Sequence, residues 1–166
     1  MITIIIGTNR KDSNSAKIAN LYSQLLTNAQ TEHKVLHLEN RDILHRNEEV
    51  LQIENEYLFN TQKFIFILPE YNGSFPGIFK LLIDNSDIKN AWWYKKVMLV
   101  GVADGRGGNL RGLDHISNML HYMRMNLYFH KVYLSQIRML LDDNGYITDP
   151  VVMAEIDTQI KGYLEY

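Results

Sequence analysis

Residues 69–77, Pro-Glu-Tyr-Asn-Gly-Ser-Phe-Pro-Gly, form the loop of this sequence with the most residue types that could contact a ligand. The loop follows an apolar run at residues 64–68, which is typical of a strand buried on both faces of a sheet. Proline ends the strand because it has no N–H group to donate. A tight turn needs only about two residues. The surplus of polar groups and glycines therefore predicts that this loop lies against a bound molecule.

The loop after the N-terminal strand has the composition of a phosphate-binding loop. Thr8, Ser13 and Ser15 carry hydroxyl groups just before a segment of helical periodicity, and Arg10 adds a positive charge. Helix N-termini bind phosphate through their free N–H groups. Helix capping by Ser13, Asn14 or Ser15 would also account for these three residues, but it does not account for Arg10. No Gly-x-x-x-x-Gly-Lys-Ser/Thr pattern occurs, which argues against a nucleoside triphosphatase.

A third loop, residues 104–108, reads Asp-Gly-Arg-Gly-Gly. It matches a dinucleotide-binding fingerprint only in part. It follows the fourth predicted strand rather than the first, and Leu110 stands where a third glycine or an alanine belongs. Two interpretations remain open at this point: close approach of the backbone to a flat ligand, or a simple glycine-rich turn.

Strands and helices alternate along the chain. Apolar runs predict strands at residues 2–6, 34–38, 64–68, 97–102 and 132–134, and helical periodicity predicts helices at residues 16–26, 50–58, 78–83, 110–123 and 151–164. This alternation predicts right-handed βαβ units and a parallel sheet. Five strands with five helices predict an α/β, flavodoxin-like three-layer sandwich. In this fold a five-stranded parallel sheet of order 2-1-3-4-5 carries helices on both faces. Residues 1–166 are expected to form a single domain.

The predicted sheet brings the three unusual loops together. In a sheet of this order, ligands bind at the edge where the strands end, beside strand 1. The three unusual loops follow strands 1, 3 and 4, which meet at that place. The sequence therefore predicts one binding site built from all three loops.

Composition excludes several functions. A net charge of −2 gives no long-range attraction for nucleic acid or for an anionic membrane. The chain has no cysteine, which excludes disulfides, thiolate metal sites and a cysteine nucleophile. Its six histidines show no metal-ligand spacing, so no metal site is predicted. No apolar run approaches the length of a membrane span, and the apolar N-terminus is too short for a signal peptide. We expect a cytoplasmic protein.

Residues 7–15, 69–77 and 105–108 resemble, in order and spacing, the NADPH-dependent FMN reductase family, a group of flavodoxin-like flavoproteins that includes quinone, azo-dye and chromate reductases. The resemblance runs from residue 1 to about residue 125. It implies non-covalently bound FMN, with NADPH or NADH as co-substrate. It also implies hydride transfer from the nicotinamide to the flavin, and then to a small acceptor such as a quinone, an azo compound, a metal oxyanion or free flavin. No catalytic side chain is expected, because the cofactor carries the chemistry.

The resemblance also implies roles for individual residues. It assigns the FMN phosphate to Thr8, Arg10, Ser13, Asn14 and Ser15, the isoalloxazine to Pro69, Glu70, Tyr71, Asn72, Gly73 and Ser74, and closure of the pocket to Gly107 and Gly108. This chain departs from the family pattern at three positions. Thr8 replaces a usual serine and preserves the hydroxyl. Ser15 replaces a usual asparagine with a shorter group, and Leu68 replaces a common threonine, which is expected to remove a hydroxyl near the ring.

The resemblance further implies a homodimer or homotetramer, with the helix from residue 78 to residue 84 near the interface. Lys80 and Asp84 are candidate cross-subunit partners. The alternative for this pair is an exposed i,i+4 contact on a single helix.

Two other functional classes remain. The first is a flavodoxin-type electron carrier without nicotinamide turnover. Classical flavodoxins are strongly acidic and have no arginine in the phosphate loop, so the charge of −2 and Arg10 argue against it. The second is a flavin-free relative with a structural or regulatory role, and the intact phosphate and ring loops argue against that.

Overall fold

The computed structural model describes residues 1–166. In chain order the elements are β1 (Ile2–Ile6), α1 (Asn14–Asn28), β2 (His33–His37), α2 (Glu48–Ile53), the π-helix η1 (Glu54–Leu58), β3 (Lys63–Pro69), α3 (Gly77–Asn85), α4 (Ile88–Ala91), β4 (Lys96–Val102), α5 (Leu110–Tyr122), β5 (Asn126–Leu127), β6 (Val132–Leu134), α6 (Ile137–Leu140) and α7 (Pro150–Glu165). The short helices α4 and α6 were not predicted, since segments of four residues carry too little periodicity. The helix predicted at residues 50–58 is present as α2 followed by η1.

The sheet has the predicted order. Its strands run β2-β1-β3-β4-β5 and every pair is parallel. The fifth position is divided between two short strands. Lys96 and Val97 of β4 pair with β5, whereas Val100 to Val102 pair with β6. Only β6 was predicted, because the two residues of β5 show no pattern of their own.

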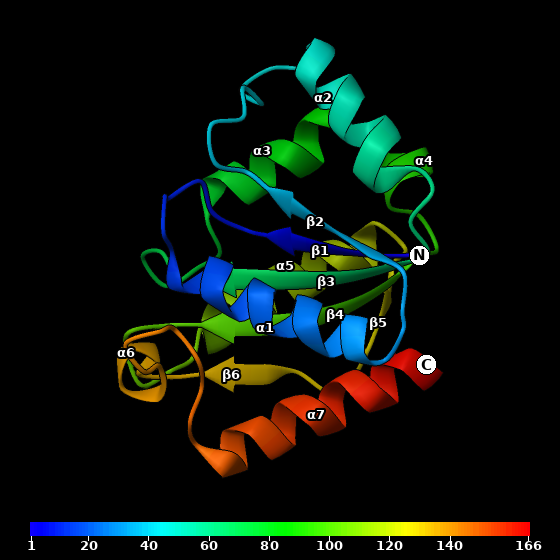
Figure 1. The fold of residues 1–166 in the computed structure, drawn as a ribbon. Helices are drawn as coiled ribbons and strands as arrows, with labels where there is room; N and C mark the ends of the chain where they lie inside the picture. Colours follow the sequence, from blue (N-terminus) through cyan, green and yellow to red (C-terminus); the bar gives the residue numbers. More distant parts are fainter.

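Alternate residues of each strand face opposite sides of the sheet, and each side is buried under helices. Phe64, Phe66 and Leu68 of β3 belong to the core under α2, α3, α4 and α5. Ile65 and Ile67 belong to the core under α1 and α7. Figure 1 shows α1 and α7 on one side of the sheet and the other group on the opposite side. The arrangement is the predicted three-layer sandwich. No helix combines the length and the apolar character that a membrane crossing requires.

Polar side chains define where several helices begin. The hydroxyl of Ser13 accepts a hydrogen bond from the N–H of Ala16 at the start of α1. Asn47 caps α2 in the same way, and Asp149 caps α7 just before Pro150. The Ser13 cap fixes the first turn of α1, in the loop that follows β1.

Gln159 of α7 completes the hydrogen bonding where the fifth strand is interrupted. Residues 128–131 separate β5 from β6. The buried amide of Gln159 donates to the carbonyls of Leu99 and His130, at 3.1 and 2.9 Å, and accepts from the hydroxyl of Tyr22 at 2.6 Å. Burial raises the pKa of Tyr22 well above its ordinary value, with a contribution from Glu155, so the phenol remains a donor. One side chain thus connects α1, β4 and α7.

Replacement of Gln159 by leucine is expected to lower the free energy of unfolding by about 2–4 kcal/mol, because it leaves several buried polar groups without partners. Urea unfolding followed by circular dichroism measures the change. Thr158→Ala, an exposed substitution on the same turn, is the control and should alter stability by no more than about 0.5 kcal/mol. Equal, small effects of the two substitutions would contradict the role given to Gln159.

Candidate functional site

A cavity of about 630 Å³ opens at the edge where the strands end. Its lining comes from residues 10–15 and 17 after β1, from residues 69–73 after β3, from residues 102–105 at the end of β4, and from Ile137 and Arg138. The volume is in the range of small-molecule binding sites. The three loops singled out in the sequence therefore meet, as predicted, around one cavity.

Most of the predicted site residues line this cavity. Nine of the thirteen do so: Arg10, Ser13, Asn14, Ser15, Pro69, Glu70, Tyr71, Asn72 and Gly73. Thr8, Ser74, Gly107 and Gly108 do not. No group of three or more histidine, aspartate or glutamate side chains is placed to hold a metal ion.

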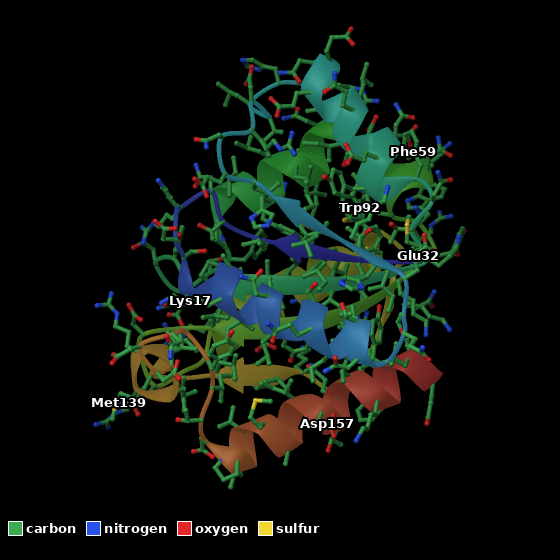
Figure 2. All side chains as sticks on the ribbon, viewed as in Figure 1. Lys17, Glu32, Phe59, Trp92, Met139 and Asp157 are labelled. Carbon is green, nitrogen blue, oxygen red and sulfur yellow. The ribbon has the colours of Figure 1, made fainter.

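The N-terminus of α1 has the features of an anion-binding site. Its first N–H groups, those of Asn14 and Ser15, have no acceptor within the helix. The hydroxyl of Ser15 is buried, with the residue only 1% exposed, and has no hydrogen-bond partner. Three cationic side chains, Arg10, Lys11 and Lys17, line the same part of the cavity and take no part in the ion pairs of the chain. Figure 2 shows Lys17 near the start of α1. Free N–H groups, an unpaired hydroxyl and positive charge together favour a bound anion.

The loop after β3 is a tight turn. Tyr71 and Ser74 exchange two backbone hydrogen bonds, of 2.8 and 3.1 Å. Between them Asn72 and Gly73 have φ values of 53° and 77°, as a type I′ turn requires. The N–H of Glu70 donates to the carbonyl of Val102 at 3.0 Å, which ties the loop to the end of β4. The loop is therefore held in one conformation beside the cavity.

Tyr71 joins this turn to the first loop. Its hydroxyl lies 2.6 Å from the hydroxyl of Thr8, and the guanidinium carbon of Arg10 lies 4.0 Å from the centre of its ring. The hydroxyl of Thr8 also accepts from the N–H of Arg10 at 3.2 Å. Thr8 is only 2% exposed. Its hydroxyl thus serves contacts within the protein.

One glycine of the third loop, Gly108, is needed for packing. Gly108 is buried at a φ of +55°, and a Cβ added to it would lie 2.7 Å from Cβ of Tyr133. A Cβ added to Gly101 of β4 would lie 2.1 Å from the carbonyl oxygen of Gly108. The close approach at Gly108 is therefore to Tyr133 of the protein itself, and it does not decide between the two interpretations of this loop. Gly105 is the glycine of this loop that lines the cavity.

Two other residues point away from the cavity. Leu68 is fully buried in the core, where its side chain packs closely on Gly7. The expectation that Leu68 removes a hydroxyl near the ligand was therefore wrong, because a side chain at this strand position faces the core. The hydroxyl of Ser74 lies 3.0 Å from Nδ1 of His115 on α5.

Sequence reasoning missed the segment that follows β6. Gln136 N–H donates to the carbonyl of Gly105 at 2.9 Å, and Ile137 N–H donates to that of Ala103 at 3.0 Å. The guanidinium of Arg138 pairs with the carboxylate of Asp104 at 3.1 Å. Met139 projects outward from α6 at the same end of the molecule (Figure 2). The available signal was topological: every loop that follows a parallel strand emerges at this edge.

Comparison with known proteins agrees with the geometry. The sequence profile of the NADPH-dependent FMN reductases matches residues 1–138. A quinone reductase of Pseudomonas putida strain KT2440 is 26% identical over 168 residues, which cover 94% of this chain and 90% of that protein.

Several solved structures share the fold. FerB, a flavoenzyme NAD(P)H:(acceptor) oxidoreductase from Paracoccus denitrificans, has a TM-score of 0.84 and 21% identity, covering 99% of this chain and 95% of that one. The apo form of the NADH:FMN oxidoreductase EMOB has a TM-score of 0.75 and 19% identity, covering 98% and 87%. An azoreductase from Bacillus anthracis strain Sterne has a TM-score of 0.63 and 12% identity, covering 99% of both chains.

At identities of 12–21%, the similarity to these solved structures shows a shared fold. The profile match covers most of the sequence, including the loops after β1, β3 and β4. With 138 of 166 residues matched, the chain belongs to the NADPH-dependent FMN reductase family, oxidoreductases that use FMN and a reduced nicotinamide cofactor.

Proposed function

We propose that the protein binds FMN in the cavity between its three loops and passes reducing equivalents from NAD(P)H to a small acceptor, of which a quinone is the first to test. The observation that carries this proposal is the buried, unpartnered hydroxyl of Ser15 at the N-terminus of α1. A buried polar group without a partner is unfavourable unless a ligand supplies one. When bound, FMN supplies the redox chemistry.

The residues at the start of α1 fit the phosphate end of FMN. Arg10 contributes a cation, Ser13 and Ser15 contribute hydroxyls, and Asn14 and Ser15 contribute free N–H groups. Thr8 is assigned a different role from the one that the family resemblance implies. Because its hydroxyl is buried and already used by Tyr71 and Arg10, we propose that it anchors the loop rather than holding the phosphate.

The other side of the cavity fits a flat heterocycle with polar edges. Pro69 to Gly73 offer the groups of a type I′ turn, and the end of β4 with the residues that follow it, Val102 to Gly105, lines the cavity beside them. The proposal therefore keeps Pro69, Glu70, Tyr71, Asn72 and Gly73 as ring-binding residues. Ser74 and Gly108 are assigned a supporting role, since they hold the loops in place from outside the cavity, whereas exposed Gly107 is assigned no contact with the ring.

A quinone is proposed as acceptor because a quinone reductase is 26% identical along nearly the whole chain. Azo compounds, metal oxyanions and free flavin are the other acceptors to compare. We assign no side chain to bond breaking: the chain's residues bind and orient the reactants. A reaction that consumes NAD(P)H, in a chain without cysteine, fits the reducing cytoplasm, which we propose as its location.

Protein purified and mixed with FMN is expected to become yellow and to oxidise NADPH or NADH when a quinone is present. Absorbance at the nicotinamide band measures the turnover, and free FMN at the same concentration without protein is the control. A protein that takes up no FMN would contradict the proposal. A yellow protein that oxidises neither nicotinamide would instead be an electron carrier.

Ser15→Ala is expected to weaken FMN binding about tenfold, because a hydrogen bond to a charged phosphate is lost. The affinity for riboflavin, which has no phosphate, should stay within about twofold of the wild type. Flavin fluorescence titrations measure both constants. Ser23→Ala, on the same helix but bonded to His33, is the matched control and should leave FMN affinity unchanged. Equal FMN affinity in Ser15→Ala and the wild type would rule out the proposed phosphate contact.

We also propose that the protein is a homodimer or homotetramer, with α3 near the interface. Phe75 and Ile78 at the start of α3 are only partly buried, although they pack on the core. Lys80 and Asp84 pair with each other at 2.7 Å within one helix, so the contact expected across subunits is satisfied inside one chain.

Light scattering at the protein concentration of the activity assay is expected to give two or four times the mass of one chain. Lys80→Ala should leave this mass unchanged, because an exposed ion pair contributes little. A monomer mass under these conditions would contradict the oligomer.

A further inference from the structure

Tyr71 lines the cavity from the loop after β3 and contacts Thr8 and Arg10 of the loop after β1. We propose that Tyr71 is a positioning residue, which holds the guanidinium of Arg10 over the phosphate site before FMN binds and is itself anchored by Thr8. The inference rests on the proposed FMN site, in which Arg10 contacts the phosphate and Tyr71 positions Arg10.

Tyr71 is well suited to act as a fixed platform. Its backbone is held on both sides of the type I′ turn by the paired hydrogen bonds with Ser74. Its hydroxyl is held by Thr8 at 2.6 Å, and Thr8 is buried at the end of β1. Both ends of the side chain are therefore restrained by parts of the protein that do not depend on a ligand.

The side chain of Arg10 stacks on the ring of Tyr71. The guanidinium carbon lies 4.0 Å from the ring centre, whereas the chain's hydrogen bonds to Arg10 involve only its backbone N–H. No carboxylate forms an ion pair with it. A contact through the face of the guanidinium leaves its five in-plane N–H groups free. Stacking on Tyr71 thus orders Arg10 without using the donors that an anion needs.

Thr8 restrains Arg10 in a second way. Its hydroxyl accepts from the N–H of Arg10 at 3.2 Å while it is also bonded to Tyr71. The main chain and the side chain of Arg10 are therefore both set by the Thr8–Tyr71 pair. A flexible arginine loses conformational freedom when it binds a ligand, and ordering it beforehand removes part of that loss. Lys11, the next residue, also lines the cavity but has no aromatic contact.

The test compares dissociation constants for FMN and riboflavin, because their ratio isolates the contribution of the phosphate. Tyr71→Leu removes the stacking surface and should lower the ratio of the riboflavin to the FMN constant about tenfold. Tyr71→Phe keeps the ring and should lower the ratio by about threefold at most. Circular dichroism melting confirms that each variant is folded.

A double-mutant cycle shows whether Tyr71 acts through Arg10. In an Arg10→Met background, Tyr71→Leu should change the ratio by less than about twofold, because the group that it positions is gone. In a Lys11→Met background, the same substitution should still lower the ratio about tenfold, since Lys11 does not contact the ring.

An unchanged ratio in Tyr71→Leu would overturn the inference, and so would a full tenfold fall in the Arg10→Met background. If Tyr71→Leu does not fold, Tyr71→Phe is the deciding variant. If Tyr71→Phe lowers the ratio of the riboflavin to the FMN constant as much as Arg10→Met does, the effect belongs to the hydroxyl and the stacking role is rejected. Wild-type protein that binds neither flavin would overturn the proposed function and this inference with it. If the wild type binds FMN tightly and the Tyr71 variants keep the wild-type ratio of the riboflavin to the FMN constant, the inference about Tyr71 is rejected and the proposed function stands.

Discussion

The pairing of β3 with β1 on one side and with β4 on the other is the constraint on which the rest of the structure depends. In this register Ile6 of β1 lies opposite Ile67, and Val102 of β4 lies opposite Pro69. Because the strands are parallel, all three end at the same edge. A shift by one residue would exchange the two faces of β3, and Phe64 and Phe66 would then enter the core that holds Ile65 and Ile67. The loops that follow Ile6, Pro69 and Val102 are thereby brought around one cavity.

The cavity is formed by rigid loops rather than by catalytic side chains. The turn at Asn72 and Gly73 is closed by its own hydrogen bonds, and Gly108 is packed between β4 and Tyr133. At the opposite end, α1 presents free N–H groups and the unpaired hydroxyl of Ser15. This division fits an enzyme family in which the cofactor reacts and the protein supplies binding and orientation.

Periodicity and turn chemistry predicted most of the fold, because those signals are local. The strands at residues 64–68 and 97–102 are continuous apolar runs, and both were predicted close to their observed bounds. The division of the fifth strand was not predictable in this way. The carbonyls of Leu99 and His130 near the interruption are bonded by the amide of Gln159, which lies on a helix 29 to 60 residues further along the chain.

The sequence by itself determined the alternation of strands and helices, the parallel sheet order and the three loops that surround the cavity. Those features follow from local patterns combined with the geometry of parallel sheets. Only the tertiary structure decided which loop residues face the cavity. Thr8 and Gly108 turn inward to support the loops, whereas Gly105 and Arg138 line the cavity. The direction of a loop side chain depends on contacts with segments distant in sequence, and a local pattern does not encode those contacts.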